Sequence, residues 1–254
     1  MKIFAKAKVN IFLKIVGKRG EYHELLSRFV RVEDLYDELS LEKKQTADYF
    51  ELVGEFGCSL EKNTLYKALV AFKEAGFTKE VDEFCATYAL HVKKNIPSFA
   101  GLGGGSSDAA SFLVMLNELL NTHLSKEQLS QIGSKVGADV PFFIYDYASA
   151  NVSGIGEVVE VFDEEVLHVK VFTPTLACDT AKVYKAFRQN YKIDLPLADT
   201  MSKMKSSELL QKYQDIELND LLPAALSLYP ALEEYRKKGW FFSGSGSSFF
   251  HIKS

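Results

Sequence analysis

Alternating apolar and polar residues predict several β-strands along this chain. Between Lys8 and Val16 the apolar side chains Val9, Ile11 and Leu13 occupy every second position. This alternation is typical of a strand that buries one face and exposes the other. Shorter apolar runs predict further strands at residues 27–32, 38–43, 49–53, 85–92, 140–144, 157–161, 168–172 and 249–253.

Helical spacing is clearest after residue 107. Ala109, Phe112 and Leu116 recur at intervals of three and four residues, which predicts a helix with one buried face. Ser106 or Ser107 can act as the N-cap of this helix. Further helices are predicted at residues 63–75, with Gly76 as the C-cap, and at 126–135, 181–189, 207–214 and 230–238.

Strands and helices follow one another without a regular βα order. This mixed order favours an α+β architecture over a doubly wound parallel sheet. No strong linker divides the chain, and a weak boundary is predicted near Asn151. We therefore expect an N-terminal domain of residues 1–151 and a C-terminal domain of residues 152–254.

Composition places the chain among ordinary globular proteins. Hydrophobic residues make up 47% and charged residues 25% of its 254 residues, which excludes a mostly disordered chain. The net charge of −4 shows no excess of basic residues of the kind that is typical of nucleic-acid-binding proteins. No apolar run approaches the ~20 residues of a membrane span, and lysines interrupt residues 1–8, unlike in a signal peptide. The sequence predicts a cytoplasmic protein without nucleic-acid or membrane partners, and leaves its oligomeric state open.

The three cysteines give no sign of a disulfide framework or a metal site. Cys58, Cys85 and Cys178 are odd in number and far apart, and no Cys-x-x-Cys pair occurs. We expect three small buried thiols in a reducing compartment. The histidines outside the motifs described below show no ligand spacing either: His91, His123, His168 and His251.

The most informative segment is a glycine-rich loop that opens the helix after residue 107. Four of the five residues from Gly101 to Gly105 are glycine, so backbone N–H groups can approach a ligand closely. The unpaired N–H groups and the positive end of a helix favour a bound anion, and phosphate fits best. The hydroxyls of Ser106 and Ser107 can meet a phosphate oxygen or a metal ion. The alternative interpretation is a tight turn with a serine cap.

Two common phosphate-binding patterns do not fit this loop. Walker A requires a lysine after its last glycine, and serine follows Gly105. The Gly-x-Gly-x-x-Gly pattern fails because Ser106 stands at the position of its last glycine. What remains is similar to the central Pro-x-x-x-Gly-Leu-Gly-x-Ser-Ser motif of the GHMP small-molecule kinases, named for galactose, homoserine, mevalonate and phosphomevalonate.

Four other segments strengthen this resemblance, at residues 7–13, 17–25, 137–143 and 243–248. They resemble an N-terminal Ala-Lys-x-Asn strand, a turn containing Tyr-His, a Gly-Ala-Asp-Val-Pro segment and a late glycine-serine loop. The resemblance implies a two-domain α+β fold, with an N-terminal domain like domain 2 of ribosomal protein S5 and a ferredoxin-like C-terminal domain. It also implies ATP as co-substrate, with Mg²⁺.

Within the GHMP kinases, the sequence Gly-Leu-Gly-Gly-Gly-Ser-Ser-Asp-Ala-Ala resembles the motif of one branch in particular. Its substrate carries a cytidine diphosphate, and it phosphorylates a 2-hydroxyl in the non-mevalonate route to isoprenoid precursors. By this resemblance Asp139 is the catalytic base and Lys8 its cationic neighbour. The substrate-binding candidates are Asn10, Tyr22, His23 and Tyr184.

The resemblance also implies an extended nucleotide site. Its residues are the loop Pro97, Ser98, Phe99, Ala100, Gly101, Leu102, Gly103, Gly104, Gly105, Ser106 and Ser107, with Asn63 and Lys94 at the border of the adenine pocket. No acidic cluster marks a protein-held metal site, so the metal ligands are not predicted. Two alternatives remain: another GHMP kinase acting on mevalonate or homoserine, or a non-catalytic nucleotide sensor with the same fold.

Overall fold

A computed structural model describes residues 1–44, 49–190 and 193–253. The chain forms two compact units, each assembled from three segments. Unit 1 contains Met1–Ala7, Asp34–Ile96 and Gly104–Asp146, and unit 2 contains Lys8–Glu33, Pro97–Gly103 and Tyr147–Ser254. The chain therefore passes repeatedly from one unit to the other. The domain boundary near residue 151 stays a prediction.

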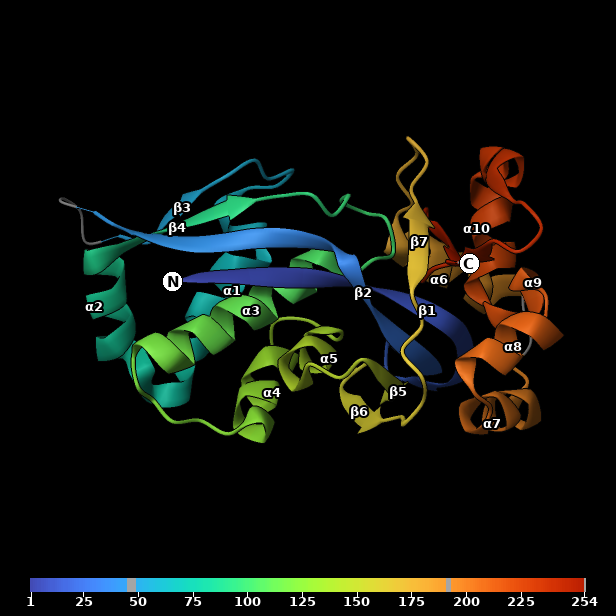
Figure 1. The fold of residues 1–254 in the computed structure, drawn as a ribbon, viewed down its shortest axis with the longest axis horizontal. Coiled ribbons are helices and arrows are strands. Elements are labelled where there is room, and N and C mark those ends of the chain that lie inside the picture. The colour runs from blue at the N-terminus through green and yellow to red at the C-terminus, as the bar shows by residue number, and fades with distance from the viewer. Residues whose placement is uncertain (45–48, 191–192, 254) are drawn as a thin grey trace. The chain divides into compact units, whose positions relative to one another are not determined.

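Two long strands take part in both units. β1 (Lys2–Arg19) and β2 (Tyr22–Lys43) are joined by a two-residue turn and pair with each other (Figure 1). Gly20, in this turn, has a φ of 60°, a conformation that suits glycine. The sequence predicted shorter strands here, because charged residues between positions 33 and 38 interrupt the apolar alternation of β2.

In unit 1 the second half of β2 is part of a six-stranded sheet. It pairs with antiparallel β4 (Tyr88–Lys93), and β3 (Glu51–Val53) lies parallel to β4. The helices of this unit are α1 (Thr64–Phe72), α2 (Thr78–Thr87), α3 (Gly104–Leu119), α4 (Lys126–Ser134) and α5 (Val140–Tyr145). A π-helical turn, Lys73–Phe77, joins α1 to α2, and a 3₁₀ turn, Leu60–Lys62, precedes α1.

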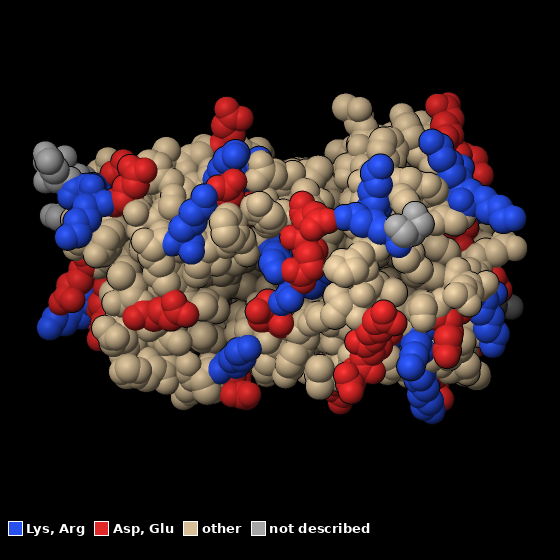
Figure 2. All heavy atoms as spheres, viewed as in Figure 1, with Lys and Arg blue, Asp and Glu red and all other residues tan. Residues whose placement is uncertain are grey.

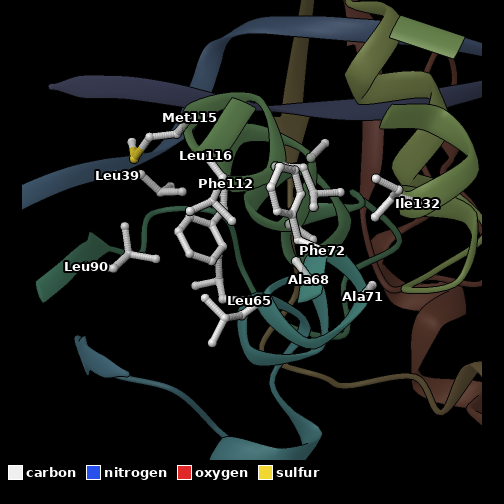
Figure 3. Packing of buried hydrophobic residues seen from close by; sticks show 14 of the residues in the cluster. Leu39, Leu65, Ala68, Ala71, Phe72, Leu90, Phe112, Met115, Leu116 and Ile132 are labelled. Carbon is white, nitrogen blue, oxygen red and sulfur yellow. The ribbon is translucent and has the colours of Figure 1, made fainter. Parts of the chain in front are cut away.

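The hydrophobic core of unit 1 lies between these helices and the strands. Figure 3 shows Phe112 and Leu116 of α3 close to Leu65 of α1, with Leu39 and Leu90 contributed by β2 and β4. The ring centroid of Phe112 lies 5.7 Å from that of Phe50 and 5.6 Å from that of Phe84. Buried aromatic pairs of this kind add to the stabilisation from area burial. This packing fixes α3, whose first residues belong to the glycine-rich loop.

In unit 2 the first half of β2 pairs with β5 (Ser149–Gly154), which in turn pairs with β6 (Val158–Val161). A second sheet has the order β7 (Val169–Phe172), β9 (Phe249–Ile252), β8 (Phe241–Phe242). The helices, orange to red in Figure 1, are α6 (Thr180–Asn190), α7 (Leu195–Lys203), α8 (Ser206–Lys212), α9 (Asp215–Leu218) and α10 (Leu221–Leu228), followed by a 3₁₀ helix, Pro230–Tyr235.

A buried charged cluster stabilises unit 2. Arg28 of β2 is fully buried and donates to Asn151, to Glu164 and to the carbonyl of Ser202. Its guanidinium carbon lies 3.3 Å from the ring centroid of Phe162. Burial lowers the pKa of Arg28 to about 10, although Glu164 opposes the shift. An unpaired charge here would be strongly destabilising. The bonds of Arg28 tie β2 to β5 and to the ends of α7 and α8.

The α+β fold class predicted from the sequence is confirmed, and some elements differ. The apolar run at residues 140–144 was predicted as a strand and is instead helix α5. The segment at residues 85–87, predicted as the start of a strand, ends α2. Gly76, predicted as the C-cap, has a φ of 106° and breaks the helical conformation between α1 and α2. The prediction of three buried thiols is wrong for Cys58, which is exposed.

Along residues 1–44, 49–190 and 193–253, the chain forms no helix that is both long and apolar enough to cross a membrane. On the face drawn in Figure 2, basic and acidic side chains alternate, with uncharged surface between them. This distribution agrees with the small net charge of −4. It offers no single-sign patch of the kind that binds a nucleic-acid backbone on that face.

Candidate active site

The first half of the glycine-rich loop, in unit 2, packs directly against the late glycine-serine loop. Gly101 has a φ of 73°, and a Cβ at this position would lie 2.2 Å from the carbonyl oxygen of Ser243. The Ser243 hydroxyl donates to the Gly101 carbonyl at 3.1 Å, and the Ser248 amide donates to that of Ala100 at 3.1 Å. Only glycine allows this approach of two backbones. The sequence predicted both loops, and the structure brings them together.

Lys8 lies beneath these loops, in β1. It is 3% exposed, and its Nζ donates to Asn10 Oδ1 at 2.6 Å and to the Gly101 carbonyl at 3.3 Å. The ammonium also lies 4.4 Å from the ring centroid of Phe29. These partners compensate the buried charge and fix its position. Lys8 is therefore not a solvated edge lysine of the usual kind.

Asn10, two residues after Lys8 in β1, links Lys8 to Ser243 and to Ser27. Its backbone N–H donates to the hydroxyl of Ser243 at 3.3 Å, and its Nδ2 donates to the hydroxyl of Ser27 at 2.9 Å. Because its Oδ1 accepts from Lys8, both ends of the side-chain amide are bonded within the protein. Asn10 thus orients Lys8, and its predicted contact with substrate stays a prediction.

Asn219 was missed by the sequence analysis. Its Nδ2 donates to the carbonyls of Phe242 at 3.2 Å and Gly244 at 2.9 Å, and its Oδ1 accepts from the Leu221 amide. This buried side chain holds the start of the late glycine-serine loop in place. Its neighbour Asp220 forms a buried ion pair with Lys14 of β1. No local pattern signals either role, because every partner except Leu221 is distant in sequence.

The second half of the glycine-rich loop is the first turn of α3, in unit 1. Helix α3 begins at Gly104, so Ser106 and Ser107 lie inside the first turn and the predicted N-cap position is wrong. The Ser107 hydroxyl donates to the carbonyl of Lys6 at 2.7 Å, and the Thr64 hydroxyl donates to that of Gly105 at 2.7 Å. The helix N-terminus is thus anchored to β1 and to the start of α1. Its backbone N–H groups and dipole favour an anion.

Asp139 lies in the turn that leads into α5, next to the first turn of α3. It is the residue that precedes Val140, the first residue of α5, and it is partly exposed. A Cβ on Gly137 would lie 3.7 Å from the hydroxyl oxygen of Ser106, so the two segments touch within unit 1. The turn that carries Asp139 therefore lies next to the candidate phosphate-binding turn.

The predicted adenine-pocket residues have structural partners in unit 1. Asn63 is the N-cap of α1, and its Oδ1 accepts from the Leu65 amide at 2.9 Å. Lys94 forms ion pairs with the buried carboxylates of Asp37 and Asp108. Contact of either residue with a nucleotide stays a prediction.

Two of the three predicted cytosine-binding side chains meet in unit 2. The rings of His23 and Tyr184 have centroids 5.3 Å apart, and the ring of Phe187 lies 6.1 Å from His23. The Nε2 atom of His23 is buried and has no hydrogen-bond partner. The side chain of Tyr22 is 66% exposed. The His23–Tyr184 pair forms an aromatic surface, which suits a nucleobase.

Burial and nearby positive charge both disfavour the protonated form of His23. Burial lowers the pKa of His23, and the positive charges of Arg188 and Lys18 lower it further. Arg188, on the same helix as Tyr184, also donates to the carbonyl of Glu21 at 2.7 Å. This bond ties α6 to the turn between β1 and β2. A neutral imidazole retains one donor and one acceptor nitrogen for a base edge.

The predicted catalytic pair is divided between the units, with Lys8 in unit 2 and Asp139 in unit 1. Their approach to each other stays a prediction. The described parts of the chain contain no group of three or more His, Cys, Asp or Glu side chains that could hold a metal ion. These residues do not fit a protein-built cage for Mg²⁺, which often keeps water and phosphate oxygens as its ligands.

The chain is similar to GHMP kinases over its whole length. The family model described as "GHMP kinases N terminal domain" matches residues 63–147. A solved mevalonate kinase from Methanococcus jannaschii shares the fold, with a TM-score of 0.61 at 14% identity, covering 100% of this chain and 90% of that one. The fold is that of the GHMP small-molecule kinases, as the glycine-rich loop predicted.

Higher identity is found with one group of these enzymes. A 4-diphosphocytidyl-2-C-methyl-D-erythritol kinase from Sulfurimonas denitrificans is 53% identical, covering 100% of this chain and 97% of the relative. The Helicobacter pylori enzyme of the same name is 43% identical, covering 97% and 92%. A crystal structure of 4-(cytidine 5'-diphospho)-2C-methyl-D-erythritol kinase aligns with a TM-score of 0.77 at 31% identity, covering 100% and 90%. The chain belongs to the 4-diphosphocytidyl-2-C-methyl-D-erythritol kinase family.

Proposed function

We propose that this protein transfers the γ-phosphoryl group of ATP to the 2-hydroxyl of 4-diphosphocytidyl-2-C-methyl-D-erythritol, a step in non-mevalonate isoprenoid precursor biosynthesis. Family membership supports the reaction. The observation that carries the proposal is the position of the Asp139 turn, which touches the first turn of α3 within unit 1. A proton acceptor next to a phosphate-binding helix terminus is what transfer to an alcohol requires.

The ATP phosphates bind at the glycine-rich loop. Residues 104–107 supply backbone N–H groups at the α3 terminus, and the bonds from Thr64 and Ser107 hold this turn rigid before the nucleotide arrives. Preorganised N–H groups bind phosphate without the cost of ordering a flexible loop. Mg²⁺, when bound with ATP, neutralises charge on the phosphate oxygens.

Asp139 and Lys8 act on the acceptor alcohol. Asp139 accepts the proton of the 2-hydroxyl as its oxygen attacks the γ-phosphorus in line with the leaving ADP. Lys8, fixed by Asn10 and the Gly101 carbonyl, stabilises negative charge that develops on oxygen during transfer. This assignment requires the two units to place both side chains at the same hydroxyl.

The cytidine end of the substrate binds at His23 and Tyr184. The base stacks on the aromatic surface of His23 and Tyr184, with the exposed Tyr22 as a second ring. This site accounts for selection of a cytidine-bearing alcohol over a small acid. The location of the protein in the cytoplasm remains a prediction from the sequence.

One assay separates the candidate functions. The protein is incubated with ATP and Mg²⁺ together with 4-diphosphocytidyl-2-C-methyl-D-erythritol, mevalonate or homoserine, and ADP release is measured. We expect release only with the cytidine-bearing alcohol. Turnover of mevalonate or homoserine instead would assign a different GHMP kinase, and nucleotide binding without release from any alcohol would assign a sensor.

A further inference from the structure

Three charged side chains of unit 1 form a buried cluster, and its two carboxylates have no role in the proposed reaction. They are Asp37 of β2, Lys94 just after β4, and Asp108 in the first turns of α3. The side chains are 0%, 19% and 4% exposed. Two carboxylates and one ammonium leave an excess negative charge in a buried place, which is costly unless the contacts compensate it.

Lys94 joins the two carboxylates. Its Nζ donates to Asp37 Oδ2 and, at 2.6 Å, to Asp108 Oδ2. Asp37 Oδ1 accepts from the backbone amides of Asn95 at 2.5 Å and Ile96 at 2.8 Å. The cluster therefore fixes the chain at residues 94–96, which leads into the glycine-rich loop, and connects it to α3.

The cluster lies directly against the start of α3. A Cβ on Gly104 would lie 2.9 Å from Cγ2 of Ile96 and 3.6 Å from Oδ2 of Asp37. Gly104 is the first residue of the helix, and Asp108 stands one turn further on. The bonds of Thr64 and Ser107 already tie this turn to α1 and β1. The cluster adds a third tie, to β2 and to the end of β4.

We propose that Asp37 and Asp108, joined through Lys94, are positioning residues that hold the first turn of α3 in the orientation required to bind the ATP phosphates. The inference rests on the proposed function only in that this helix terminus binds the triphosphate. Neither carboxylate touches the nucleotide. Each acts through the backbone N–H groups of residues 104–107.

The environment of Asp108 agrees with a positional role. Its Oδ1 is buried without a hydrogen-bond partner. Burial raises the pKa of Asp108 to about 7; Lys94 opposes this shift and the charge of Asp37 reinforces it. The two carboxylates outweigh the effect of burial on Lys94, whose pKa is raised. A displacement of about 1 Å in a functional group can lower the reaction rate on the order of 100-fold. A tie that fixes the first turn of α3 is therefore important.

The test compares Asp108→Asn with Asp108→Leu in the full-length protein. Asparagine keeps an oxygen that accepts from Lys94, whereas leucine has similar volume and no acceptor. For Asp108→Leu we expect the KM for ATP and the Kd for the analogue AMP-PNP to rise by roughly tenfold or more, with kcat and the KM for the alcohol within about threefold. For Asp108→Asn we expect AMP-PNP affinity within about threefold of the parent protein.

Glu164→Gln provides the matched control. Glu164 is a buried carboxylate, 3% exposed, in the Arg28 cluster of unit 2. Its substitution should lower the unfolding temperature and leave AMP-PNP affinity unchanged. A general loss of stability in the Asp108 variants would reduce the active fraction, and hence kcat, without changing either KM. The split between KM and kcat therefore distinguishes positioning from stability.

Two results would overturn the inference: a folded Asp108→Leu protein with the parent affinity for AMP-PNP, or an Asp108→Asn protein as weak as Asp108→Leu. If Asp108→Leu fails to fold, Asp37→Asn replaces it. There the amide retains an acceptor for Asn95 and Ile96 but not for Lys94, and unchanged AMP-PNP affinity would again contradict the proposal. A parent protein that binds AMP-PNP but phosphorylates nothing would refute the proposed function alone, whereas no binding at all would refute both.

Discussion

Asp139 owes its proposed role to its neighbours rather than to its residue type. An aspartate before Val-Pro is an ordinary way to begin a helix, and α5 does begin after it. What distinguishes this one is the contact between Gly137 and Ser106, which brings the turn to the start of α3. Chemistry at this carboxylate therefore depends on packing between α3 and α5.

The substitution Asp139→Asn tests this role. The amide of the new side chain cannot accept the hydroxyl proton, so we expect kcat to fall by roughly 100-fold or more. The Kd for AMP-PNP should stay within about threefold, because the helix terminus that binds phosphate is untouched. Single-turnover phosphoryl transfer and calorimetric titration measure the two quantities. Near-parent turnover in this variant would contradict the assignment of the base.

Asp108 should make the stability of the protein depend on pH. Its pKa is about 7 in the folded state, against 3.8 for the ordinary group, so the folded chain binds a proton that the unfolded chain has released. The free energy of unfolding should therefore decrease as pH rises from about 4 to about 7, and level off above that range. Asp108→Asn should lack this component. Urea unfolding at a series of pH values measures the difference, and equal slopes for both proteins would be evidence against it.

Asp37 and Asn219 could not be identified from the sequence because their partners are remote. Asp37 lies 57 positions from Lys94, and Asn219 reaches Gly244 across 25 positions. Their local sequence is unremarkable for a strand end or a helix start. The glycine-rich loop and Asp139 were identified because each lies inside a contiguous motif. Sequence analysis therefore offers candidates for the groups that contact ligands, whereas the groups that hold them in place become visible only in the structure.

At the scale of elements, periodicity predicted most strands but only five of the ten α-helices in the described residues: α1, α3, α4, α6 and α8. Helix α5 has six residues, all apolar or aromatic, and a short buried strand would have the same composition. Helix α10 is apolar around most of its surface and was missed. Helix α2 was missed because Gly76 ended the predicted helix, whereas the chain continues after a π-helical turn. Tertiary packing decided these cases.

The contact between the two loops of unit 2 leads to a prediction for Gly101. Alanine there must adopt a φ of 73° and place its Cβ 2.2 Å from the Ser243 carbonyl oxygen. Both loops must separate, so we expect Gly101→Ala to lose at least roughly tenfold in kcat/KM in addition to stability. Steady-state kinetics and thermal unfolding measure these effects.

Gly239→Ala is the control for backbone strain alone. Gly239 has a φ of 80°, and a Cβ there would meet nothing within 4 Å. This variant should lose about 1 kcal/mol of stability and keep the parent kcat/KM. If both glycine variants behaved alike, the close approach of the two loops would have no functional importance.

At the scale of the whole molecule, the proposed ligands bind to different parts of the chain. We propose that nucleotide phosphates bind at α3 in unit 1 and that the cytidine end binds at His23 and Tyr184 in unit 2. A ligand that binds only the folded protein stabilises it, by about 2.7 kcal/mol at 100 times its Kd. AMP-PNP and CDP, the latter standing for the cytidine end, should therefore each raise the unfolding temperature.

Tyr184→Leu should separate the two effects. Loss of the aromatic surface should abolish the shift caused by CDP, because base stacking contributes roughly 1–3 kcal/mol. The shift caused by AMP-PNP should persist. Tyr213→Leu is the matched control and should keep both shifts. Tyr213 is partly buried and directly follows α8. Loss of the AMP-PNP shift in Tyr184→Leu, or retention of the CDP shift, would exclude the assigned base site.

The ion pair between Lys14 and Asp220 joins positions 206 residues apart. During synthesis, at roughly 5–20 residues per second, the ribosome therefore needs roughly 10–40 s after making Lys14 before its counter-charge exists. For that interval the apolar first strand is without its late partners and open to association with other chains. Conditions that slow translation should lengthen this exposure and lower the soluble yield of the protein.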